Sequence, residues 1–131
     1  MEKIYTVDFE VDADELEPQM FQILDQNKTL WGHRLDEPLF AIKNLHISSD
    51  NARVCGKNQD TIQIYDEETS VKYVMFFCKD NNELLQWISN NWGDQEANIT
   101  VVGTLGLSYY EGKYDCQVII KDVEINETIQ N

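Results

Sequence analysis

Histidine and cationic residues are scarce in this chain, and their scarcity limits what it can do. Only two histidines and ten lysines and arginines occur among 131 residues, against 24 aspartates and glutamates, for a net charge of −14. A chain this acidic is on average a poor nucleic-acid binder, because phosphate backbones are bound by clustered lysines and arginines. The charge by itself indicates a well-solvated surface.

Long apolar runs and paired cysteines are also missing. No apolar run approaches the ~20 residues of a membrane span, and residues 1–8 lack the apolar centre of a secretory signal. Cys55, Cys78 and Cys116 are widely spaced without a CxxC pair, which excludes a zinc ribbon or a thioredoxin-like site. We therefore expect buried free thiols in a reducing compartment, a cytoplasmic location and no membrane contact.

The composition indicates one domain with a hydrophobic core, since 42% of the residues are hydrophobic and 11% aromatic. Residues 1–35 form an acidic segment with a short extended piece at 4–11. A helical stripe follows at Leu16, Met20, Ile23 and Leu24, and the helix should stop near Asn27. We interpret this segment as a strand-helix linker.

From residue 36 the periodicity changes to that of strands. The predicted elements are a long strand over 39–56 with turn residues at 48–51, strands over 61–65 and 70–78, a helix over 84–92, and strands over 99–110 and 114–125. Five strands with one helix after the third predict a mainly β chain with the OB-fold, a five-stranded, partly open Greek-key barrel. Gly103 and Gly106 are interpreted as bend or bulge positions. The predicted domain spans 36–126, and 127–131 is a frayed tail.

Four short motifs resemble one family when taken in order. They are Tyr5-Thr-Val-Asp-Phe-Glu-Val-Asp; Trp31-Gly32 with Asp36-Glu-Pro-Leu-Phe40; Val54-Cys-Gly-Lys57; and Gly103-Thr-Leu-Gly-Leu-Ser-Tyr-Tyr-Glu-Gly112 followed by Gln117-Val-Ile-Ile-Lys-Asp122. Together they resemble the C-terminal region of RecJ-type single-stranded-DNA exonucleases, over residues 6–125. The chain departs from the family pattern at Leu30, where proline is usual, and at Arg34-Leu35, where Gly-Asn is usual.

The catalytic half of that family has no counterpart here. Its nuclease centre uses Asp/His motifs, including Asp-His-His, whereas this chain has only His33 and His46. His46 fits a strand surface, and residues 66–68 fit a solvated hairpin tip. We therefore expect no catalytic residue, metal site or cofactor in this chain. The resemblance places Mg²⁺ or Mn²⁺ in nuclease domains that are absent from it.

A binding site is better supported than an active site. OB-folds bind single strands across their second and third strands, with two loops as clamps. The alternation in 61–65 and 70–78 predicts one outward face, while Arg53 adds charge and 57–59 and 109–113 are the clamp loops. The predicted nucleic-acid site comprises Arg53, Lys57, Gln63, Tyr65, Lys72, Phe76, Tyr110 and Lys113.

Two functions remain open. In the first, the chain is a non-catalytic OB domain of a RecJ-like 5′→3′ exonuclease, a hydrolase of DNA recombination and repair. It then binds single-stranded DNA weakly when alone, beside the catalytic domains of the same polypeptide. In the second, Tyr65, Phe76 and Tyr110 pack against the N-terminal helix or the missing domains, and the acidic surface docks a basic protein partner without touching DNA. A basic groove favours the first, and an evenly acidic surface favours the second.

Overall fold

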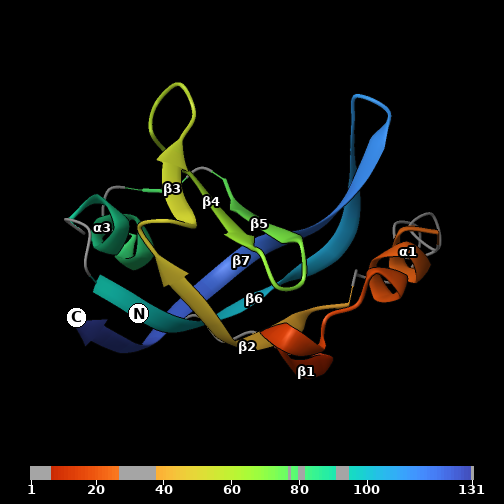
Figure 1. Cartoon of the computed structure of the whole chain (residues 1–131), viewed down its shortest axis with the longest axis horizontal. Coiled ribbons are helices and arrows are strands. Elements are labelled where there is room, and N and C mark those ends of the chain that lie inside the picture. The colour runs from red at the N-terminus through yellow and green to blue at the C-terminus, as the bar shows by residue number, and fades with distance from the viewer. Residues whose placement is uncertain (1–6, 27–37, 77, 80–81, 91–94, 131) are drawn as a thin grey trace.

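The computed structural model describes residues 7–26, 38–76, 78–79, 82–90 and 95–130, without the side chains of Tyr110 and residues 127–130. A strand and a helix come first, followed by strands, a second helix and two long strands (Figure 1). The elements are β1 (Phe9–Asp12), η1 (Ala13–Glu15), α1 (Pro18–Gln26), β2 (Phe40–Ser48), β3 (Ala52–Cys55), β4 (Thr61–Asp66), β5 (Val71–Met75), α3 (Glu83–Ser89), β6 (Gln95–Tyr110) and β7 (Lys113–Gln130).

These strands form one sheet in the order β1-β2-β6-β7-β5-β4-β3. The β1–β2 and β5–β7 pairs are parallel and the other pairs are antiparallel. β2 and β3 lie near opposite ends of this order, yet only residues 49–51 separate them in the chain. Four peptide links span at most about 14 Å, so the sheet has to curl until these two strands approach each other. The result is the predicted partly open OB-fold, whose first strand is divided into β2 and β3.

A bulge in β2 keeps its apolar side chains in the core. The register with β6 shifts between residues 42 and 45, and the intervening Lys43 and Asn44 are both exposed. Asn44 has a φ of 61°, a left-handed conformation that asparagine tolerates better than most residues. Its side-chain amide donates to Asp12 Oδ1 at 2.8 Å, and Lys43 Nζ lies 3.2 Å from Glu10 Oε2. The bulge therefore also fastens β1 to the barrel.

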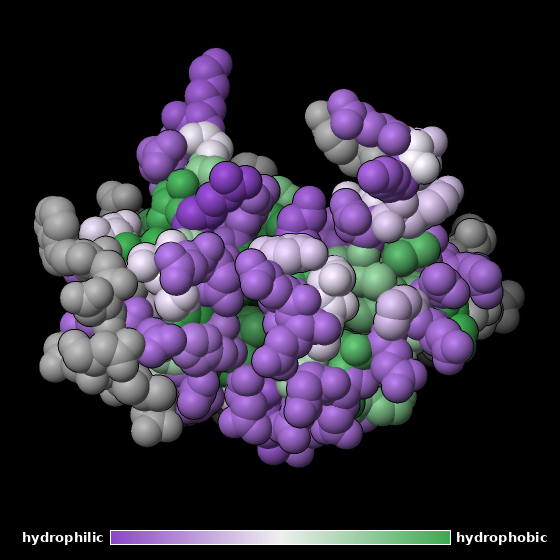
Figure 2. Space-filling view, in the orientation of Figure 1, coloured by the Kyte–Doolittle hydropathy of each residue, from purple (hydrophilic) through white to green (hydrophobic). Residues whose placement is uncertain are grey.

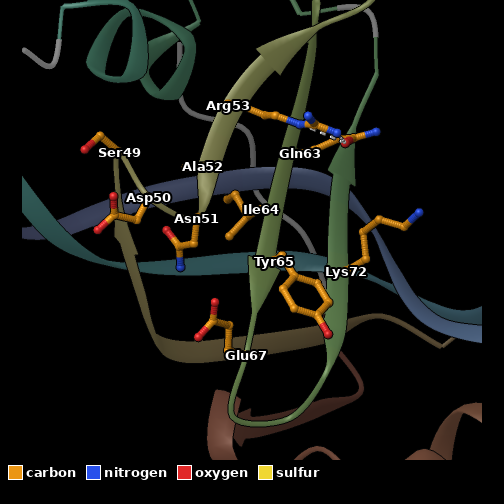
Figure 3. A pocket seen from close by; sticks show the side chains of 10 residues that line it. All are labelled: Ser49, Asp50, Asn51, Ala52, Arg53, Gln63, Ile64, Tyr65, Glu67 and Lys72. Atoms are coloured by element: carbon orange, nitrogen blue, oxygen red, sulfur yellow. Dashed lines mark hydrogen bonds between the residues drawn. The ribbon is translucent and has the colours of Figure 1, made fainter. Parts of the chain in front are cut away.

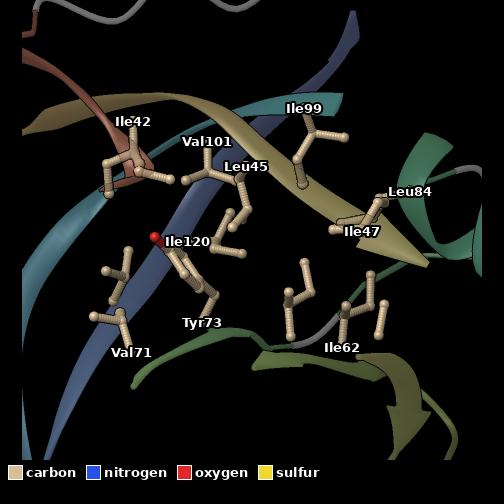
Figure 4. Close-up of a cluster of buried hydrophobic side chains, with 14 of the residues drawn as sticks. Ile42, Leu45, Ile47, Ile62, Val71, Tyr73, Leu84, Ile99, Val101 and Ile120 are labelled. Carbon is tan, nitrogen blue, oxygen red and sulfur yellow. The ribbon is translucent and has the colours of Figure 1, made fainter. Parts of the chain in front are cut away.

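The core fills the curled sheet and is covered at one end by α3 (Figure 4). Complete burial of an aliphatic side chain such as Leu84 contributes about 1.5–3 kcal/mol, which holds this short helix on the barrel. The labelled core residues are Ile42, Leu45 and Ile47 of β2, Ile62 of β4, Val71 and Tyr73 of β5, Leu84 of α3, Ile99 and Val101 of β6, and Ile120 of β7.

The N-terminal helix differs from the predicted one in the face it buries. α1 ends at Gln26, close to the expected position, but its buried residue is Phe21 and Ile23 is 58% exposed. The predicted stripe assumed one continuous helix from Leu16. In the structure Leu16 is extended after η1 and α1 begins at Pro18, so the helical phase is not the predicted one.

The long hairpin of β6 and β7 corrects two further predictions. β7 continues past the expected end at residue 125, and the backbone of 127–130, predicted as a frayed tail, pairs with 95–98. With Ile129 as their one apolar residue, these residues give little strand signal in the sequence, and their pairing depends on the length of β6. Gly103 lies at a register shift as predicted, but Gly106 pairs regularly with Gln117 and is not a bulge. The division of the chain at residue 35 stays a prediction.

Candidate nucleic-acid interface

The outer face of β3, β4 and β5 brings together four of the predicted site residues. Arg53 stands opposite Gln63, and Tyr65 stands opposite Lys72, so register alone places their side chains on one face. The Arg53 guanidinium donates to Gln63 Oε1 from Nη2 at 2.8 Å and from Nε at 3.3 Å. These four residues line a pocket of about 420 Å³ that also includes Asp50 and Glu67 (Figure 3).

The aromatic residues on this face divide as the alternation predicts. Tyr65 is 46% exposed and Phe76 48% exposed, whereas Tyr73 is completely buried in the core. Phe77, which the same alternation predicts to face inward, lies outside the described residues. Val74 shares the outward face but is only 3% exposed, because it stands between Gln63 and Ile119 on the adjacent strands. The face is therefore not a row of free side chains, and Val74 is part of its closed floor.

Two hairpins flank this face. The β3–β4 turn contains Gly56, with a φ of 93°, and carries Lys57 in an exposed position. The β6–β7 turn has positive φ at both Glu111 (51°) and Gly112 (80°), and it is followed by the exposed Lys113. Such backbone angles are typical of the tight turns that suit twisted hairpins. Both hairpins project at the top of the view, with β4 and β5 between them (Figure 1), and stand on either side of a broad dip (Figure 2). The side chain of Tyr110 lies outside the described residues.

Two exposed tyrosines form a pair on the long hairpin; Tyr109 lies in the predicted clamp loop 109–113, but its pairing with Tyr114 was not predicted. Tyr109 and Tyr114 stand opposite each other with ring centroids 4.9 Å apart, and they are 63% and 67% exposed. They share the parity of the buried Leu105 and Val118, so they continue the core-facing side of the hairpin beyond the core. The sequence signal for this pair was two tyrosines on either side of a Glu-Gly turn. Their exposure could not be predicted from it, because it depends on how far the hairpin extends beyond the core.

The cations of the site form no ion pair with an acid among the described residues. Four of the chain's ten lysines and arginines lie on this face or its hairpins, namely Arg53, Lys57, Lys72 and Lys113. The ion pairs found within the described ranges, Lys43–Glu10 and His46–Glu96, involve none of them. In a chain with 24 acidic residues, cations without an ion pair in the described part of the chain therefore gather on this face and its hairpins.

A strongly acidic pocket adjoins that region. Its volume is about 660 Å³, and Asp50, Tyr65 and Glu67 line both pockets. The acidic residues that line it are Asp12, Asp14, Asp50, Asp66, Glu67 and Glu68. The side of this face toward the β4–β5 turn is therefore negative and repels other anions, whereas Arg53 and Lys72 supply positive charge away from that turn.

Potential metal ligands form no metal-binding group, and the cysteines are free, in the part of the chain that the structure describes. No group of three or more His, Cys, Asp or Glu side chains there is placed to hold a metal ion. Asp66 Oδ1 accepts from the Glu68 amide at 3.1 Å, so it stabilises its own turn. The three cysteines are free, and burial raises the pKa of the Cys78 and Cys116 thiols, which disfavours the reactive thiolate. No described helix has the length and apolar character needed to cross a membrane.

Comparison with known proteins agrees with this fold. The model of the RecJ OB domain matches residues 7–122. Over 130 residues the chain is 32% identical to YorK of Bacillus subtilis (strain 168). That protein is named as a provisional, SPbeta prophage-derived single-strand DNA-specific exonuclease. The corresponding protein of Bacillus phage SPbeta matches equally well. The alignment covers 98% of this chain but only 22% of each relative. Because the family model matches residues 7–122 and the fold agrees with it, the chain belongs to the RecJ OB-domain family.

Proposed function

We propose that this chain is the non-catalytic OB domain of a RecJ-type 5′→3′ single-stranded-DNA exonuclease, and that it holds the DNA strand for the nuclease domains. The observation that supports this most directly is the outer face of β3–β5, where Arg53, Gln63, Tyr65 and Lys72 meet and neither cation forms an ion pair within the described residues. The proposal includes the family's context of DNA recombination and repair and a cytoplasmic location. The resemblance places any Mg²⁺ or Mn²⁺ in the nuclease domains.

The geometry gives each side chain a role in binding. The half-exposed rings of Tyr65 and Phe76 provide surfaces on which bases stack, and each such contact is worth about 1–3 kcal/mol irrespective of base identity. Lys72 and Arg53 lie where the sugar-phosphate backbone then passes. Because Gln63 holds the Arg53 guanidinium from one side, that cation is positioned before DNA arrives. Lys57 and Lys113 add charge on the flanking hairpins.

Substitution of the two rings tests the proposal. Tyr65→Ala and Phe76→Ala should each weaken binding of a fluorescent oligothymidine by about fivefold or more, while the melting temperature changes little because the rings are half-exposed. Phe9→Ala is the matched control, since Phe9 is 53% exposed on β1, away from the site. A wild-type chain that does not bind the oligonucleotide at low salt, or ring variants that bind as it does, would contradict the proposal.

A second candidate function rests on the acidic pocket. Six carboxylates around one concavity suit a lysine- or arginine-rich segment, supplied by the catalytic domains of the same polypeptide or by another protein. The double variant Glu67→Gln/Glu68→Gln separates the two functions. If the pocket docks protein, this variant should weaken association with the purified nuclease domains. If the pocket only repels DNA, the variant should instead strengthen oligonucleotide binding.

A further inference from the structure

The two glycines of β6, only three residues apart, meet different surroundings. A Cβ atom built on Gly103 would lie 2.3 Å from the carbonyl oxygen of Ile119 on β7, a distance that real side chains do not adopt. Because that oxygen belongs to the backbone of the neighbouring strand, it cannot move aside without disturbing the sheet. The close approach of β6 and β7 therefore requires glycine at Gly103.

Gly106 has no such requirement. A Cβ atom placed there would find no other atom of the described residues within 4 Å. Its φ is not among the positive values that the backbone adopts at Gly56 and Gly112, and it pairs regularly with Gln117. Alanine or a β-branched residue would fit this strand and be favoured over glycine, which loses more conformational freedom on folding. The fold leaves this bare position unexplained, and a ligand that approaches the backbone closely is the other reason for glycine in a strand.

The register places Gly106 in line with the candidate interface. Tyr65 stands opposite Lys72, Lys72 opposite Gln117, and Gln117 opposite Gly106, so the four residues form one row on the outer face. Adjacent strands are roughly 4.8 Å apart, so the row is about 14 Å long. It contains a ring, a cation, an amide and an open patch of backbone, and no acid. The next row toward the hairpin tip contains Asp115, which disfavours a phosphate path in that direction.

We propose that Gly106 is a DNA-contacting position, where a base of the single strand lies flat against the bare backbone of β6. This inference rests on the proposed function and extends its site beyond β5, across β7 to β6. The Gln117 amide, which can both donate and accept, lies beside that base and bonds to whichever edge it presents. Lys72, in the same row, faces the phosphate. A side chain at Gly106 would lift the base from the sheet and remove the contact.

Filling the open position tests this inference. Gly106→Val should keep or raise the melting temperature and weaken binding of an oligothymidine of about 16 nucleotides by about fivefold or more, with Gly106→Ala intermediate. Asn98→Val is the matched control, because it places the same side chain on β6 about 26 Å away, at roughly 3.3 Å per residue. Gly103→Ala is the structural control and should lower the melting temperature.

The outcomes separate this inference from the function on which it rests. If the wild type does not bind the oligonucleotide, the proposed function fails and this inference fails with it. If the wild type binds and Lys72→Ala weakens binding, but Gly106→Val binds normally, only the Gly106 contact is wrong. If both Gly106 variants lower the melting temperature, the position is needed by the fold and the inference is overturned.

Discussion

Tyr73 is a residue whose side-chain acidity is changed by the fold. Its side chain is completely buried, and within the described residues its hydroxyl has no hydrogen-bond partner. Burial raises the pKa of Tyr73 well above its usual range, and the nearby Asp66 carboxylate raises it further. The hydroxyl must therefore stay protonated in the folded chain.

A pH dependence of stability follows from this residue. The folded pKa lies above the unfolded value of about 10, so this contribution to stability is complete below pH 10 and is lost as the pH rises beyond it. Tyr73→Phe should be close to wild type in unfolding free energy at pH 7, since it removes an unpaired hydroxyl. Above pH 10 it should lose less stability than the wild type. Denaturant titrations at pH 7 and at about pH 10.5 measure this, and parallel losses in both proteins would show that Tyr73 does not titrate on unfolding.

At the scale of elements, the β2 bulge explains how the N-terminal strand joins the barrel. Asn44 combines a left-handed backbone with a side-chain bond to Asp12. Asn44→Ala loses both favourable features and should cost about 1–2 kcal/mol of unfolding free energy. Asn44→Gly keeps the backbone conformation and should cost less. Denaturant unfolding of both variants checks the order, and equal losses would assign the whole effect to the side-chain bond.

For the whole molecule, the opposition between net charge and local charge should set the strength of the proposed DNA binding. A charge of −14 repels the strand, whereas Arg53 and Lys72 attract it over a short range. Two or three phosphate contacts predict a slope of about −1.5 to −2 for log affinity against log salt concentration. We therefore expect weak binding that weakens further with salt, measured by fluorescence anisotropy at several salt concentrations. Tight binding that does not change with salt would contradict this charge arrangement.

Local patterns determined much of this protein from the sequence. The alternation in 61–65 and 70–78 was enough to place Tyr65 and Lys72 outward and Tyr73 in the core, because side chains in a strand alternate irrespective of what the strand pairs with. The change of period at residue 84 gave the second helix, and the order of elements gave the OB-fold. Each of these inferences depends on neighbours in the chain.

What only the tertiary structure decided depends on how distant strands meet. The burial of Val74 follows from its neighbours on β4 and β7, and the exposure of Tyr109 and Tyr114 from the length of the hairpin beyond the core. In the sequence Gly103 and Gly106 look equivalent. The approach of the Ile119 carbonyl to one and the open space over the other distinguish them. Register and the curl of the sheet set these contacts, and both arise from packing over the whole barrel and not from any local run of residues.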